Sequence, residues 1–249
     1  MSGGTKAETI RSKCGAYSEL RSYRRSGKFY LGIDVGSTSS DIVVFDESME
    51  ILFCDYKRTR GKPIETVYNQ LTGIFEEISS NDVTVLGVTG SAGRLLSRLL
   101  GVGFSNEVPA QAAAIDWLYP EIEGGSIIEM GGQDSKLIFV NRVKGVLRVR
   151  DFSLNSVCAA GTGSFLDQQA QRLGVNIEDE FGRLALESEN VPRMAGRCSV
   201  FAKSDMIHLQ QQATPTCDIV AGLCMALARN LKSNLGCGRE FVKPIIFTG

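Results

Sequence analysis

Several features that mark common protein classes are missing from this 249-residue chain. It has no run of about 18 apolar residues, so we expect no transmembrane helix. It has one histidine and no CxxC pair, which disfavours a zinc site built from local ligand pairs. Its net charge is only −1, which provides no overall attraction to nucleic acid or to an anionic membrane. We therefore expect neither nucleic acid nor a membrane among its partners.

The start of the chain differs in charge from the rest. Residues 1–28 contain seven Lys or Arg against two Asp or Glu, without the apolar stretch of a secretory signal. We expect a solvated, partly disordered basic extension, with a docking arm for a partner as the alternative. Without an export signal, the seven cysteines are expected to be reduced thiols in a cytoplasmic protein.

Two similar segments, residues 29–46 and 125–141, each contain an apolar strand, a turn of small residues and a second apolar strand. An offset of 95 residues aligns the turns: Asp34 with Glu129, Gly36 with Gly131, and Ser37 with Gly132. A repeat at a fixed offset indicates an internal duplication. We therefore predict an α/β fold with two subdomains, residues 29–120 and 121–249, each led by a β-hairpin.

Apolar periodicity places the remaining elements. Helices are predicted over 63–79, 92–100, 109–118, 162–173, 177–187, 199–212 and 218–235, and further strands near 50–56, 83–88, 145–152 and 244–247. The last strand leads into Thr248-Gly249, and a glycine turn at this point usually precedes another element. We therefore expect the sequence to be a piece of a longer protein, with the second subdomain truncated at its C-terminus.

The two glycine turns predict a nucleotide site. Gly36-Ser37-Thr38 and Gly131-Gly132-Gln133 can each direct several main-chain N–H groups toward one point, and such nests bind phosphate oxygens. Asp34 and Asp134 stand beside the turns, where carboxylates can hold a hydrated Mg²⁺ next to the phosphates. Neither turn has the GxxxxGK[ST] or the GxGxxG pattern, which excludes P-loop and Rossmann sites. The alternative is that both are purely structural turns at strand ends.

Two cysteines each precede a predicted helix. Cys158 is followed by Ala159-Ala160-Gly161-Thr162-Gly163, and Cys198 by Ser199. The N–H groups at a helix start favour a thiolate or a nearby phosphate, which makes Gly161, Thr162 and Gly163 candidates for cofactor binding. The simpler alternative is that both cysteines are small buried hydrophobic residues.

Four motifs, in this order, resemble a known family: GIDVGST, IIEMGGQDSK, CAAGTGSF and RCSVFAKSD. They resemble the ATP-dependent activators of 2-hydroxyacyl-CoA dehydratases, and the ATPase subunits of benzoyl-CoA reductase are similar. This family belongs to the sugar kinase/Hsp70/actin superfamily, and the resemblance extends from about residue 29 to 249. It implies duplicated actin-like (ribonuclease H-like) ATPase subdomains, mixed sheets flanked by helices, and ATP or ADP in the cleft.

The resemblance also implies an electron-transfer function. It implies a homodimer with one [4Fe–4S] cluster on its two-fold axis, bound by Cys158 and Cys198 of each chain. ATP hydrolysis would drive one low-potential electron from a ferredoxin- or flavodoxin-type donor into an acceptor dehydratase or reductase that contains iron–sulfur clusters. Because hydrolysis needs a positioned metal and water, we expect Gln133 and Asp134 to orient them.

The chain departs from the family pattern at several positions. Asp41 stands where activators commonly have Lys, and it either weakens ATP binding or points elsewhere along its strand. Lys203 replaces a Glu of the shorter activators, and the family's glycine-rich adenosine element would begin at Thr248-Gly249. Two other functions are possible: a sugar or small-molecule kinase of the superfamily, which would leave Cys158 and Cys198 unexplained, or a non-catalytic module with a structural cluster.

Overall fold

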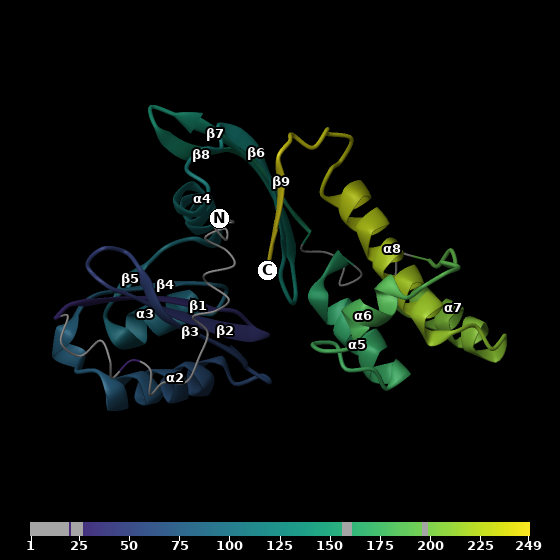
Figure 1. Cartoon of the computed structure of the whole chain (residues 1–249), viewed down its shortest axis with the longest axis horizontal. Helices are drawn as coiled ribbons and strands as arrows, with labels where there is room; N and C mark the ends of the chain where they lie inside the picture. The colour runs from purple at the N-terminus through teal and green to yellow at the C-terminus, as the bar shows by residue number, and fades with distance from the viewer. Residues whose placement is uncertain (1–19, 21–26, 156–160, 196–198) are drawn as a thin grey trace, which may run out of the picture. The chain divides into compact units, whose positions relative to one another are not determined.

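A mixed β-sheet organises each of the two units into which the chain divides, Met1–Glu121 and Ile122–Gly249 (Figure 1). The sequence places the boundary between residues 120 and 121. The computed structural model describes residues 20, 27–155, 161–195 and 199–249. Over these ranges, no helix has both the length and the apolar composition needed to cross a bilayer.

The first unit is built on a five-stranded sheet in the order β3-β2-β1-β4-β5. β2 is antiparallel to β1 and to β3, whereas β4 runs parallel to β1 and to β5. Its strands are β1 (Phe29–Val35), β2 (Ser39–Phe45), β3 (Ile51–Arg58), β4 (Val83–Thr89) and β5 (Gly103–Phe104). Its helices are α2 (Pro63–Glu77), the 3₁₀ turn η2 (Ser80–Asp82), α3 (Gly93–Leu100) and α4 (Glu107–Leu118).

Alternating apolar residues form the core of the first unit. In β1 every second side chain is buried, so one face of the strand supplies Phe29, Leu31 and Ile33 to the core. The helix α2 begins at Pro63, a residue suited to the first helical position, and packs its apolar stripe against the same core. Leu20 is fully buried in this core. The prediction of a solvated extension over residues 1–28 is therefore wrong at Leu20.

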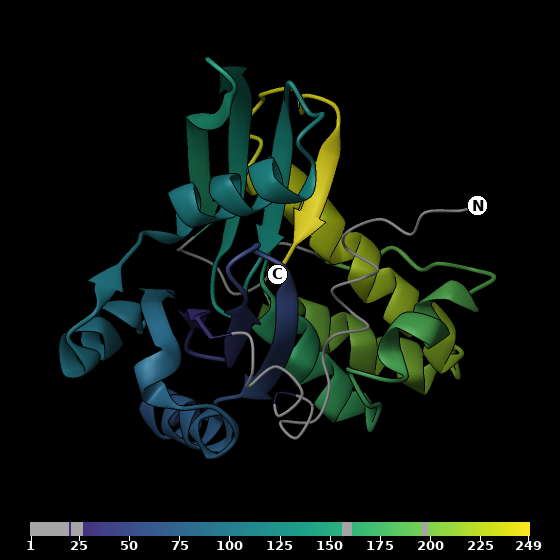
Figure 2. The same ribbon diagram turned by 60° about the vertical axis from the view of Figure 1, so that its left-hand side comes forward.

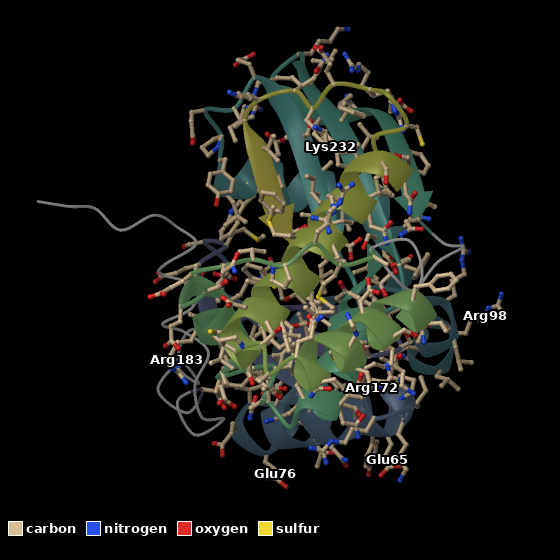
Figure 3. The ribbon with its side chains drawn as sticks, turned by 90° about the vertical axis from the view of Figure 1, so that its right-hand side faces the viewer. Glu65, Glu76, Arg98, Arg172, Arg183 and Lys232 are labelled. Atoms are coloured by element: carbon tan, nitrogen blue, oxygen red, sulfur yellow. The ribbon has the colours of Figure 1, made fainter. Side chains whose placement is uncertain are left out.

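The second unit has a four-stranded sheet in the order β8-β7-β6-β9. Its strands are β6 (Gly124–Met130), β7 (Ser135–Val143), β8 (Val146–Asn155) and β9 (Ile245–Thr248). Its helices are α5 (Gly163–Leu173), α6 (Phe181–Leu186), α7 (Ser199–Gln211) and α8 (Thr216–Asn234). The long helix α8 contacts α5, α6 and α7, and its buried side chains share one core with β6 and β7 (Figure 2). Charged side chains such as Arg172, Arg183 and Lys232 lie on the outside of these helices (Figure 3).

The strand registers confirm the predicted duplication. Ile33 pairs with Ile42 in the first hairpin, and the positions 95 residues later, Ile128 and Leu137, pair in the second. In each unit a later strand, β4 or β9, then runs parallel to the first strand of the hairpin. Two mixed sheets flanked by helices also confirm the predicted α/β class.

Three details differ from the sequence predictions. The helix α6 has six residues instead of spanning 177–187, because the side chain of Asn176 accepts the N–H groups of Glu178 and Asp179 in a turn before it. The two-residue strand β5 is too short to produce a periodic signal. Cys54 is disulfide-bonded, so the expectation that every cysteine is a thiol is wrong there, whereas Cys217, Cys224 and Cys237 are free.

Candidate functional site

The first glycine loop, Gly36 to Ser39, connects β1 to β2 and is held from its carbonyl side. The N–H of Gly36 donates to the carbonyl of Ser39 at 2.9 Å. Thr59, which follows β3, donates its N–H to the carbonyl of Thr38 at 2.9 Å and its hydroxyl to the carbonyl of Ser37. Within the described residues, no main-chain carbonyl accepts the N–H of Ser37 or Thr38. These two donors are therefore available to an anion.

The second loop, Gly131 to Asp134, connects β6 to β7 and is held in the same way by the start of α5. The N–H groups of Gly163 and Ser164 donate to the carbonyls of Gly131 and Gly132, both at 2.9 Å. The Ser164 hydroxyl also donates to the carbonyl of Gly132, as Thr59 does to the aligned position in the first unit. The structure thus brings Gly163 and the second loop together.

Because the start of α5 bonds to the second loop, the N–H groups of its first residues are not available to a cofactor. The N–H of Gly163 is already engaged by Gly131, so this residue can act through close approach and by holding the loop. A larger residue at position 163 would be crowded, because an added Cβ would lie 3.3 Å from the carbonyl oxygen of Gly131. Thr162 is buried, and Gly161 accepts the hydroxyl of Ser135 at 2.6 Å. Of the three candidates, Gly163 is therefore the one that contacts the second loop.

Within the second loop, no described carbonyl accepts the N–H of Gly132 or Gln133. Gln133 is exposed. The side chain of Asp134 is 43% exposed, and its carboxylate lies 3.1 Å from the ammonium of Lys136. The same ammonium lies 2.6 Å from the carboxylate of Glu129. Lys136 therefore fixes the two carboxylates that flank the loop.

Lys136 is a site residue that the sequence reasoning missed. It is 4% exposed, and the strand register places it opposite Glu129. A signal for it was available, because the 95-residue offset aligns Lys136 with Asp41. Position 41 commonly has Lys in the family that the sequence resembles. The alignment therefore indicates a charged residue at the equivalent position of both hairpins.

The corresponding pair in the first hairpin consists of two acids. Asp41 stands opposite Asp34 in the strand register. Burial, and then the charges of Asp34 and Asp55, raise the pKa of the Asp41 carboxyl from 3.8 to about 7. A cation beside Asp34 would oppose this shift, because it would stabilise the ionised carboxylates. The pair is therefore a place where positive charge is favoured.

The parallel strand of each unit ends in a threonine that is followed by a glycine. Thr89 pairs with Asp34, and Thr248 pairs with Glu129. Gly90 and Gly249 both have positive φ, at 97° and 116°. A Cβ on either glycine would collide with the main-chain carbonyl just before the glycine loop, that of Val35 or Met130. Only glycine lets these segments pass so close to the loops.

The predicted cluster ligands Cys158 and Cys198 lie outside the described residues. The helices that follow them in sequence are formed, with α5 beginning at Gly163 and α7 at Ser199. In the described part of the chain, no group of three or more His, Cys, Asp or Glu residues is placed to hold a metal ion. Asp34 and Asp134 belong to different units, and each lies at its own loop.

Comparisons with known proteins extend this picture. The BadF/BadG/BcrA/BcrD ATPase family matches residues 31–249. The chain is 32% identical over 212 residues to the 2-hydroxyisocaproyl-CoA dehydratase activator of Clostridioides difficile, covering 82% of this chain and 74% of that protein.

Two solved structures are similar to this chain over most of its length. The structure of component A of the Acidaminococcus fermentans (R)-2-hydroxyglutaryl-CoA dehydratase matches with a TM-score of 0.78 and 27% identity, covering 89% of this chain and 83% of that one. The Clostridium difficile activator of the 2-hydroxyisocaproyl-CoA dehydratase with bound ADPNP matches with a TM-score of 0.75 and 27% identity, covering 88% and 79%. The predicted fold class is therefore shared with both.

Proposed function

Because the chain belongs to the BadF/BadG/BcrA/BcrD ATPase family, we propose that it is an ATP-dependent activator that delivers one electron to a CoA-ester dehydratase or reductase. The observation that carries the proposal is the pair of aligned glycine loops, each held from its carbonyl side with N–H groups left available. A similar chain of known structure is a dehydratase activator with bound ADPNP, which supports a nucleotide at these loops.

In this proposal the loops bind the phosphates of ATP or ADP. Each loop supplies its own N–H groups to phosphate oxygens, those of Gly36-Ser37-Thr38 and those of Gly131-Gly132-Gln133, while Gly163 holds the second loop in place. Asp34 and Asp134 fit a hydrated Mg²⁺, which prefers carboxylate oxygens and retained waters. Gln133 and Asp134 orient a water molecule toward the γ-phosphorus, and its attack releases ADP and phosphate.

The cysteine set fits a [4Fe–4S] cluster shared by two chains. Such a cluster needs four thiolates, and Cys158 and Cys198 supply two per chain in a homodimer. Two of the described cysteines suit this role poorly: Cys54 is disulfide-bonded, and burial raises the pKa of the Cys224 thiol. Cys158 and Cys198 would hold the cluster, which would supply one-electron chemistry between a ferredoxin- or flavodoxin-type donor and the acceptor enzyme.

The start of α7 supports an interface beside Cys198. Val200 and Phe201, which follow directly in sequence, are 65% and 64% exposed. In the proposed dimer, covering these two side chains would remove apolar surface from water, which favours association. A second copy of this chain would cover them and would bring the two Cys198 residues toward one another.

Metal analysis of anaerobically purified protein tests the proposal. We expect about four iron atoms and an equal amount of sulfide per dimer, with a [4Fe–4S] EPR signal after dithionite reduction. Cys158→Ala and Cys198→Ala should each abolish that signal. Cys237→Ala is the matched control, because Cys237 is free and exposed, and it should retain the cluster.

The opposite outcomes are equally informative. A folded anaerobic protein without iron, or a cluster that survives both substitutions, would contradict the ligand assignment. Transfer of the γ-phosphate of ATP to a sugar would favour the kinase function. A cluster whose potential does not respond to ATP would favour a non-catalytic module.

A further inference from the structure

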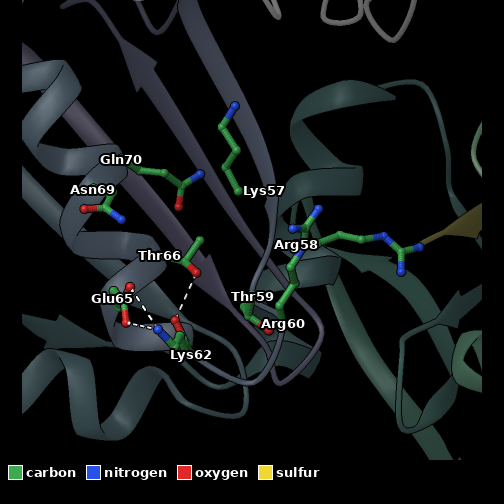
Figure 4. Close-up of a pocket in the computed structure, with 9 residues that line it drawn as sticks. All are labelled: Lys57, Arg58, Thr59, Arg60, Lys62, Glu65, Thr66, Asn69 and Gln70. Carbon is green, nitrogen blue, oxygen red and sulfur yellow. Dashed lines mark hydrogen bonds and ion pairs between the residues drawn. The ribbon is translucent and has the colours of Figure 1, made fainter.

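A pocket of about 550 Å³ lies in the first unit, between the end of β3 and the first turns of α2 (Figure 4). Its volume is within the range of small-molecule sites. The residues that line it are Lys57, Arg58, Thr59, Arg60, Lys62, Glu65, Thr66, Asn69 and Gln70. None of them belongs to the loops assigned to the nucleotide.

The lining is strongly positive, with four cationic side chains against one carboxylate. Lys62 pairs with Glu65 at 2.9 Å, and Lys57 lies 3.3 Å from Asp55. Arg60 is exposed and has no ion pair with any residue that the structure describes. An excess of cations around a concave site favours an anion with more than one negative charge.

The buried residue Gln70 contributes a hydrogen-bond acceptor to the pocket. Gln70 is 1% exposed, and its amide nitrogen faces the carbonyl of Ser40 and both the carbonyl and the carboxylate of Asp55, at 3.1–3.3 Å. These three acceptors fix the orientation of the amide. Its oxygen is left buried without a hydrogen-bond partner among the described residues, on the side that faces Thr66 (Figure 4). A buried acceptor of this kind is costly unless a ligand satisfies it.

We propose that this pocket binds a small phosphate monoester that carries hydroxyl groups. The phosphate, with a charge between about −1.5 and −2, matches Arg60 and its neighbouring cations. A ligand hydroxyl donates to the amide oxygen of Gln70, and the exposed amide of Asn69 is available to a second one. A carboxylate side chain of a partner protein would satisfy the cations but would offer Gln70 no donor.

The pocket adjoins the first glycine loop without using its N–H groups. Thr59 lines the pocket and holds the carbonyls of Ser37 and Thr38. A ligand in the pocket therefore lies on the carbonyl side of the loop, where it does not compete for the donors assigned to the nucleotide. This site goes beyond the proposed activator function and is tested independently of it.

Calorimetric titration of the full chain with glycerol 3-phosphate tests the proposal. We expect binding by the wild type and an affinity about tenfold weaker in Arg60→Gln, since one charged hydrogen-bond donor is lost. Arg98→Gln is the matched control, because Arg98 is an exposed arginine on α3 (Figure 3), and its affinity should equal that of the wild type. No binding by the wild type at millimolar ligand, or equal affinity in Arg60→Gln, would overturn the proposal.

The hydroxyl requirement has its own test. Glycerol 3-phosphate should bind the wild type more tightly than inorganic phosphate does, and Gln70→Met should lose most of that preference. Equal affinity of the wild type for both compounds would overturn the hydroxyl part. Because Gln70 is in the core, thermal unfolding checks that this variant is folded. If it is not, the Arg60→Gln comparison decides whether the pocket binds the phosphate.

Discussion

In the first hairpin Asp34 stands opposite Asp41, whereas Glu129 stands opposite Lys136 at the aligned positions of the second. The first pair is acidic, and its burial raises the pKa of Asp41 to about 7. The second pair is an ion pair with 2.6 Å between the ammonium and the carboxylate. The duplicated backbone therefore carries opposite electrostatics beside two similar loops.

This difference shows that the duplication preserves the backbone arrangement but not the side-chain charges beside it. Strand register depends on backbone geometry, and it places aligned residues opposite one another in both copies. The charge beside each loop depends on single side chains, so it can change without moving the backbone. In the activator that we propose, Lys136 is a cation beside the second loop, and Mg²⁺ beside the first loop would favour the ionised form of its two acids.

The largest expected effect is at the ion pair of the second hairpin. Lys136→Met should lower the free energy of unfolding by about 3–5 kcal/mol, because it leaves the nearly buried carboxylate of Glu129 without its cation. Urea denaturation measures this loss. The double variant Glu129→Gln/Lys136→Met should recover most of it, since no charge is then stranded. A loss below about 1 kcal/mol in the single variant would show that the pair is not a structural element.

The acidic pair of the first hairpin should make stability fall as pH rises. The folded-state pKa of Asp41, about 7, lies above its ordinary value of 3.8, so the folded protein binds this proton more tightly than the unfolded chain does. Without nucleotide or Mg²⁺, this carboxyl should remove about 3 kcal/mol of stability between pH 5 and pH 8.

Asp41→Asn should abolish that component of the pH dependence. Urea denaturation at pH 5 and pH 8 measures it as the change in the difference between variant and wild type. Glu47→Gln, at an exposed position after the same hairpin, is the control and should leave the pH dependence unchanged. Parallel pH curves for Asp41→Asn and the wild type would contradict the assignment.

The glycine after β4 tests whether the duplication extends beyond the hairpins. Gly90→Ala should cost about 2–3 kcal/mol, because it adds both a positive-φ penalty and a collision with the carbonyl of Val35. Gly61→Ala is matched in φ, at 81°, but has open space around its Cα, so about 1 kcal/mol is expected. Equal costs in thermal unfolding would mean that Gly90 is not held against the loop.

The smallest expected effects are at the hydroxyls that hold the loops. Thr59→Val and Ser164→Ala each remove a hydroxyl bond to an aligned carbonyl, that of Ser37 or of Gly132, so each should cost about 1 kcal/mol. Thr72→Val, at an exposed helical position, is the control for removing a hydroxyl. Clearly unequal losses for the two loop variants would show that the two copies hold their loops differently.

Much of the fold was predictable because its signals are local. Alternating burial in β1, the proline at the start of α2 and the glycine turns all act within a few residues. The start of α6 was misplaced because a side-chain turn at Asn176 competes with the helix. The role of Thr59 carried no local signal, because its partners Ser37 and Thr38 lie more than twenty positions earlier.

The sequence by itself determined the two glycine hairpins, their duplication and the helices that follow, since strand and helix periods and turn residues are properties of short segments. Only the tertiary structure decided that Gly163 donates to Gly131, that Lys136 bridges two carboxylates, and that Gln70 faces a cationic pocket. These contacts depend on burial and on distances between segments far apart in the chain. Burial then determines how strongly each charged group interacts and how far its pKa shifts, and no short stretch of sequence contains that information.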